Sequence, residues 1–134
     1  MRYRRFAYRY AEIVATSGPQ LLSESWSLRQ PVVLARPQWR PAGDLFETAT
    51  SLVLKVEVPG MAEEDIDVAI YADALVVEGV RRCELPAGEV RYLAAEVRYG
   101  PFSLEVPLPT DVDREQVSAR YDRGFLYVTL PKER

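Results

Sequence analysis

Apolar and polar residues alternate with a period of two through most of the chain after residue 41. The segment 52–58 carries Leu, Leu, Val and Val at every second position, and Pro59-Gly60 ends it. Apolar stripes of the same kind follow in segments 66–70, 75–80 and 102–108, and Pro107 marks an edge or a strand end in the last of these. Because successive side chains of a β-strand point to opposite faces, each segment is predicted to be a short strand with one buried face.

The last two apolar segments predict a hairpin. Apolar residues occupy every second position of 117–121 and again of 126–130, and Asp122-Arg123-Gly124 lies between them. Glycine supplies the positive φ that a tight hairpin turn requires. No segment of this body shows a sustained helical period. Six or seven short strands therefore predict an all-β fold, an antiparallel immunoglobulin-like β-sandwich.

One connection is too long for a simple sandwich. Residues 81–99 join two predicted strands and are about three times as long as an ordinary hairpin connection. The connection contains its own apolar residues, which are Val90, Tyr92, Leu93 and Val97. Apolar residues in a long connection indicate docking, and we expect a partner subunit to provide the docking surface.

The first 37 residues differ from the rest in composition. They hold six arginines against Glu12 and Glu24, although the whole chain has a net charge of -3. The apolar residues Tyr3, Phe6, Tyr10, Ile13 and Val14 recur at steps of three and four, which predicts a short amphipathic helix that ends near Gly18-Pro19. We therefore expect a flexible, partly helical N-terminal arm at 1–38, a β-domain at 39–132 and a vestigial C-terminal tail at 133–134.

Composition excludes several kinds of chemistry. The chain has no histidine, so a Ser-His-Asp triad, a Cys-His pair and an imidazole metal ligand are all excluded. No phosphate-binding glycine loop and no membrane-length apolar run occur, and the lone Cys83 cannot form an internal disulfide. Asp44 and Glu47 are a possible pair of acid/base carboxylates, but a chain with twenty acidic residues contains many such pairs by chance. We expect a cytoplasmic protein that is not an enzyme and uses no cofactor or small-molecule substrate.

The hairpin carries a resemblance to a known family. In ARYDRGFL, Ala119, Gly124 and Leu126 occupy the fixed positions of the small heat-shock protein signature A-x-x-x-n-G-x-L. Further motifs of that family stand in the same order along the chain: PAGDLFET, LVLKVEVPG, EEDIDVAI, LVVEG and EVRYGPFSLEVPLP. Together they cover about residues 39 to 132, so this segment resembles a complete α-crystallin domain.

The resemblance implies an ATP-independent holdase that binds non-native client proteins and assembles as a homodimer and, from that dimer, as a higher homo-oligomer. The long loop would carry a strand that swaps onto the partner, with dimer contacts from Val90, Tyr92, Leu93, Glu96 and Val97. An edge groove that takes tails or clients would lie beside Val68, Ile70, Val117 and Tyr121. Clients would bind the aromatic arm through Tyr3, Phe6, Tyr10, Ile13 and Trp26.

The chain also departs from the family pattern. Leu104 stands where the family usually has arginine, and Arg123 stands where the signature usually has asparagine. The sequence reaches Arg134 without the I-x-I motif with which a typical tail plugs the groove of a neighbouring subunit. Val32 and Leu34 have the same i, i+2 spacing on a segment that proline keeps extended, and they are the candidate groove plug.

Other functions remain open at this point. A co-chaperone of the CS-domain type would share the sandwich but lack the signature hairpin and the long loop, and it would be a monomer. The basic aromatic segment RYRRFAYRYA could stack on nucleic acid, with a steep loss of affinity in salt, or lie on a membrane surface. We favour an arm that balances the acidic body. Cys83 could form an intersubunit disulfide or respond to oxidation, although a lone cysteine is more often inert.

Overall fold

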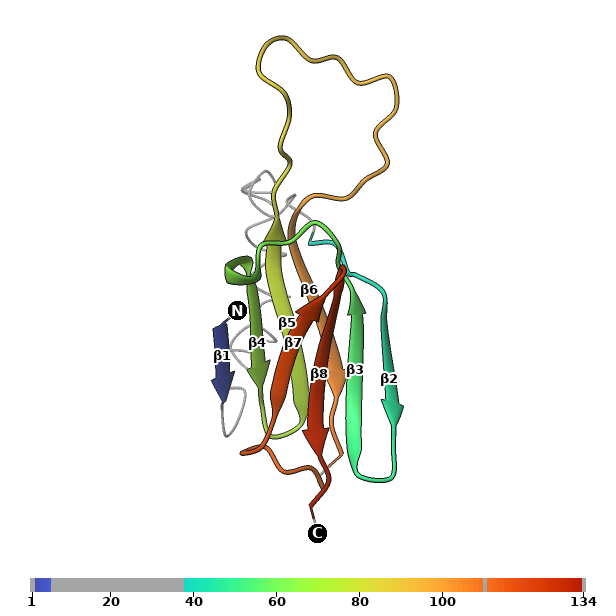
Figure 1. Cartoon of the computed structure of the whole chain (residues 1–134), viewed down its shortest axis with the longest axis vertical. Coiled ribbons are helices and arrows are strands. Elements are labelled where there is room, and N and C mark those ends of the chain that lie inside the picture. The colour runs from blue at the N-terminus through green and yellow to red at the C-terminus, as the bar shows by residue number, and fades with distance from the viewer. Residues whose placement is uncertain (1, 6–37, 110, 134) are drawn as a thin grey trace, which may run out of the picture.

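Strands account for almost all the regular structure of this chain. A computed structural model describes residues 2–5, 38–109 and 111–133. It contains one short 3-10 helix, η1 (Glu63–Asp65), within this part of the chain. The strands of the same part are β1 (Arg2–Arg5), β2 (Gly43–Glu47), β3 (Ser51–Glu57), β4 (Ile66–Ile70), β5 (Ala74–Arg81), β6 (Gly100–Pro107), β7 (Ser118–Asp122) and β8 (Phe125–Pro131) (Figure 1).

Two four-stranded sheets face each other. One has the strand order β1-β4-β5-β6 and the other β2-β3-β8-β7. In the second sheet, Leu54 pairs with Val128 and Val56 with Leu126, and all four side chains are fully buried. Ile66, Val68 and Ile70 of β4 and Leu75 and Val77 of β5 complete the core from the other sheet. The predicted β-sandwich is thus confirmed, and the period-two stripes are its two inner faces.

The predicted hairpin is β7 and β8, and its turn is tighter than expected. Gly124 has φ +87°, as a hairpin glycine should, but Arg123 also has a positive φ of +50°. Positive φ at both central positions is the requirement of a type I′ turn, whose twist matches that of the strands. A side chain at Gly124 would place its Cβ 2.9 Å from Cβ of Pro59, so glycine also permits close packing here.

The N-terminal residues pair with the body of the protein. Strand β1 lies beside β4 in parallel register, with Arg2 opposite Asp67 and Arg5 opposite Ile70 (Figure 1). The prediction of a helix that includes Tyr3 is therefore wrong for this segment. A short helix is marginal by itself, whereas the open edge of β4 offers a row of backbone partners to an extended segment. Residues 6–14 of the predicted helix lie outside the described residues.

Trp39 fastens the start of the domain to β6. Its backbone N–H donates to Pro101 O at 3.2 Å and its carbonyl accepts from Ser103 N–H at 3.1 Å. Its indole Nε1 donates to Gly100 O at 3.2 Å, and its ring centroid lies 5.2 Å from that of Phe102. These contacts make residue 39 part of the sandwich. Strand β6 ends at Pro107, as its sequence predicts.

Candidate functional site

The connection between β5 and β6 presents apolar side chains to solvent. Residues 82–99 contain no helix or strand and extend beyond one end of the sandwich (Figure 1). Leu93 is 86% exposed and Val97 63%, and Tyr92 and Val90 are also exposed. Glu96 is exposed beside them. The residues that we predicted as dimer contacts are therefore free of the chain's own core and available to a partner.

Arg81 holds the base of this loop. Its guanidinium donates through Nε and Nη2 to Arg98 O at 2.9 and 2.6 Å, and through Nη1 to Pro59 O at 3.2 Å. The same group lies over the Trp39 ring, 4.3 Å from its centroid. Beside it, Arg82 makes a 2.9 Å ion pair with Asp65, and this hydrogen bond raises the pKa of Arg82 above its usual value. The loop thus leaves the sandwich from a defined base.

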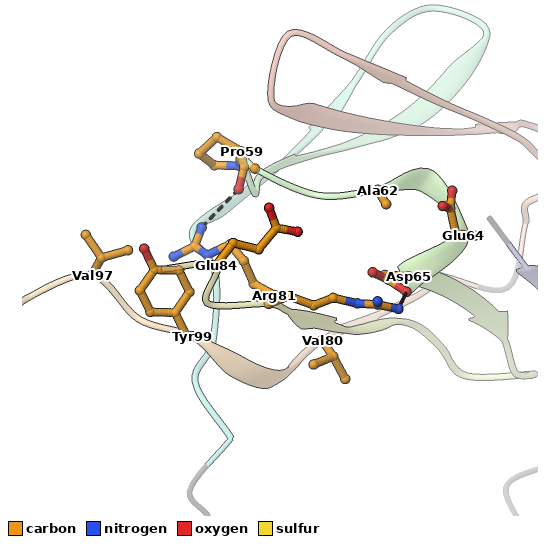
Figure 2. Close-up of a pocket in the computed structure, with 11 residues that line it drawn as sticks. Pro59, Ala62, Glu64, Asp65, Val80, Arg81, Glu84, Val97 and Tyr99 are labelled. Atoms are coloured by element: carbon orange, nitrogen blue, oxygen red, sulfur yellow. Dashed lines mark hydrogen bonds and ion pairs between the residues drawn. The ribbon is translucent and has the colours of Figure 1, made fainter. Parts of the chain in front are cut away.

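A cavity of about 600 Å³ lies at this base. Figure 2 shows Val97 and Tyr99 on one side of it and Glu64 and Asp65 on the other, with Arg81 between them. Two guanidinium groups line the cavity, and both are engaged. Arg81 donates to backbone carbonyls, and Arg82 forms an ion pair with Asp65. These two guanidinium groups therefore position the loop at its base.

Cys83 and Tyr92 meet within the loop. The Sγ of Cys83 lies 3.4 Å from the Tyr92 hydroxyl oxygen, and the cysteine is exposed. The hydrogen bond to Cys83, together with desolvation, raises the pKa of Tyr92. This contact joins the start of the loop to its middle. Disulfide formation by Cys83 stays a prediction.

The outer edge of β2 is a second exposed surface, which the sequence analysis did not single out. All five residues of β2 are exposed, including Leu45 at 41% and Phe46 at 44%. Among the described strands β2 pairs only with β3, so its other edge carries unpaired backbone groups. Leu45 and Phe46 are adjacent in GDLFE, so this segment has no alternation that would have predicted a strand, and no local pattern shows which strand will be outermost.

The residues predicted to line an edge groove contribute mainly to the core. Val68 and Ile70 are 0% and 1% exposed, and Val117 and Tyr121 pack against the same core while partly buried. The Tyr121 hydroxyl donates to Val58 O at 2.9 Å and accepts from Met61 N–H at 3.3 Å. Tyr121 thereby ties the edge strand β7 to the segment that follows β3.

Tyr121→Phe should lower the free energy of unfolding by about 1–2 kcal/mol, because two partly buried backbone groups lose their partner. Urea unfolding followed by circular dichroism measures this loss. Tyr127→Phe is the matched control, since Tyr127 lies on the outer face and its hydroxyl makes no hydrogen bond among the described residues. Equal losses in the two variants would show that the Tyr121 hydrogen bonds contribute nothing specific.

The remaining predicted residues divide into two sets. Of the signature hairpin, Ala119 packs against the core and Leu126 is fully buried, so this motif is structural. Of the arm, Tyr3 belongs to β1. The other arm residues lie outside the described part of the chain; they are Phe6, Tyr10, Ile13, Trp26, Val32 and Leu34.

The described residues show no arrangement of side chains that is typical of an enzyme's active site. Asp44 and Glu47 are three positions apart on β2 and therefore point to opposite faces, so they do not form a carboxylate pair. In the described ranges no three His, Cys, Asp or Glu residues gather closely enough to hold a metal ion. No helix of these ranges is long and apolar enough to cross a membrane.

Comparison with known proteins agrees with this arrangement. Residues 44–134 match the model of the Hsp20/alpha crystallin family. The chain is 31% identical over 93 residues to Small heat shock protein C2 of Rickettsia felis, covering 69% of this chain and 60% of that protein. It is 36% identical over 96 residues to Spore protein SP21 of Stigmatella aurantiaca, covering 72% and 57%. The aligned part thus spans about 60% of the length of these relatives.

Solved structures show the same fold. A small heat-shock protein from Xylella fastidiosa, whose crystal structure reveals a distinct high order structure, matches with a TM-score of 0.66 and 30% identity. The match covers 73% of this chain and 90% of that one. The hspA protein from Xanthomonas axonopodis matches with a TM-score of 0.65 and 30% identity, covering 72% and 96%.

Proposed function

Because the chain belongs to the Hsp20/alpha crystallin family, we propose that it is an ATP-independent holdase that binds non-native proteins and prevents their aggregation. Proteins of this family are chaperones without enzymatic activity. The observation that best supports the proposal is the family match over residues 44–134, and the exposed apolar side chains on residues 82–99 support its assembly with a partner subunit. Unfolding proteins share exposed apolar surface, and holding them by mass action needs no nucleotide.

A homodimer is the first level of the proposed assembly. The loop offers Tyr92, Leu93 and Val97, and β2 offers an exposed edge with Leu45 and Phe46. An extended loop segment of one copy can add to the β2 edge of a second copy, and two-fold symmetry repeats the contact. Both surfaces become buried in this arrangement, and the exposed backbone groups of β2 gain partners.

The client-binding site is proposed for the basic aromatic arm. Tyrosine, phenylalanine and tryptophan offer large contact areas, and arginine can stack on aromatic rings while it keeps the complex soluble. A co-chaperone of the CS-domain type agrees less well with the long loop. We place the protein in the cytoplasm, with neither nucleic acid nor membrane as its partner.

Co-elution tests the proposal. A thermally unstable client is heated with the chain in the absence of nucleotide and the mixture is separated by size. We expect the client in a soluble complex with the chain, in equal amount when ATP is added, since binding the unfolded state requires no energy source. A client that pellets in the presence of excess chain would contradict the proposed function.

A further inference from the structure

Trp39 is the residue through which the N-terminal arm enters the sandwich. It forms an isolated parallel bridge with Phe102, outside the named strands. The Trp39 N–H donates to Pro101 O, the Ser103 N–H donates to Trp39 O, and the residues on either side of Trp39 are exposed. A single bridging residue with exposed neighbours can leave the edge of β6 by local opening, because the contacts between the two sheets do not depend on it.

Arg81 connects Trp39 to the far end of the long loop. Its guanidinium lies over the Trp39 ring, 4.3 Å from the centroid, and donates through both Nε and Nη2 to Arg98 O. Strand β6 begins two residues after Arg98, at Gly100, whose φ of +87° favours glycine. The Trp39 indole donates to Gly100 O at 3.2 Å. The loop therefore enters β6 through a bend that Arg81 holds on one side and Trp39 on the other.

We propose that Trp39 and Arg81 form a latch that couples the entry of the N-terminal arm to the base of the loop. When Trp39 leaves β6, Arg81 loses its ring contact and Gly100 O loses its donor, so the loop base is loosened. A bound protein that draws the arm away from the sandwich therefore weakens the dimer. Dimer formation in turn favours the docked Trp39, because coupling between two sites is reciprocal. The inference rests on the proposed function only for this effect on the dimer.

Amide hydrogen exchange followed by NMR tests the latch on the chain itself. The Ser103 N–H donates to Trp39 O at 3.1 Å, so its exchange reports whether Trp39 is docked. Arg81→Met should accelerate this exchange by about fivefold, the factor to which one cation–π contact corresponds. Arg82→Met is the matched control, because Arg82 pairs with Asp65 instead, and it should leave the exchange of Ser103 as in the parent chain. Unchanged Ser103 exchange in Arg81→Met would overturn the latch.

Trypsin tests the coupling in the opposite direction. The peptide bond after Arg98 carries the carbonyl that Arg81 holds, whereas the bond after Arg91 lies in the middle of the loop. Trp39→Leu removes both the ring and the indole donor, and we expect initial cleavage after Arg98 to rise by about tenfold relative to cleavage after Arg91. Trp39→Phe keeps a ring for Arg81 and should give a smaller rise. An unchanged cleavage ratio in both variants would contradict the coupling.

The dimer Kd provides the last test. Trp39 belongs to neither of the two surfaces proposed to form the dimer, yet Trp39→Leu should raise the Kd by about tenfold. Adding Arg81→Met should raise it no further, because two halves of one latch do not act independently, and additive effects would overturn the latch. A parent chain that stays monomeric, with the exchange and cleavage changes present, would instead count against the proposed dimer and leave the latch in place.

Discussion

We expect replacement of Tyr92 by lysine together with Leu93 by glutamate to convert the proposed dimer into monomers that keep their β-sheet signal. Leu93 is 86% exposed and Tyr92 54% exposed in the single chain, so both are free to be buried by a partner. A buried apolar side chain contributes about 1.5–3 kcal/mol, and a symmetric dimer contains each contact twice. The loss is then about 6 kcal/mol or more, which raises the Kd by about four orders of magnitude.

Sedimentation or light scattering coupled to size separation measures this change. Glu89→Lys with Arg91→Glu is the matched control, because it alters the same loop, leaves the net charge unchanged and touches no apolar residue. The control should remain dimeric. A double variant at Tyr92 and Leu93 that remains a dimer would show that the loop is not the dimer contact.

Removal of residues 1–37 is expected to weaken client protection sharply and to leave a folded body. The residues of the core cluster all lie between Leu52 and Leu130, so the sandwich retains its core without the arm. Loss of even one well-engaged aromatic contact lowers the apparent client affinity by about tenfold. Titration of the chain against a heated client measures the amount needed for half-protection.

This truncation also removes β1, so a second variant separates the two effects. Serine at positions 6, 10, 13 and 26 removes Phe6, Tyr10, Ile13 and Trp26 and keeps Arg2–Arg5 for pairing with β4. We expect this full-length variant to lose protection as the truncated chain does. Full activity in both would place the client site on the sandwich edges.

The sheet pattern was readable in the sequence because burial of one face leaves a period-two signal. The stripe of β3 and that of β8 meet in register, and the turn at Gly124 was recognised by its glycine. The positive φ of Arg123 was not foreseen, because arginine gives no signal for that conformation. The position of the turn in the chain, by contrast, follows from the ends of the two strands that it joins.

The edges could not be read in the same way. Tyr3 has helical spacing with Phe6 and Tyr10, yet residues 2–5 pair with β4, because the free edge of a distant strand outweighs local spacing. Trp39 and the exposed edge of β2 were missed for a similar reason. Which strand is outermost depends on the order of strands in the sheet, and one strand's alternation does not contain that order.

Light scattering of a heated client, with the chain added in increasing amounts and without nucleotide, tests the central claim most directly. The account predicts that scattering falls as the chain is added and is suppressed at stoichiometric excess. Scattering that stays at the level of the client alone at that excess would contradict the assignment of this chain as a holdase.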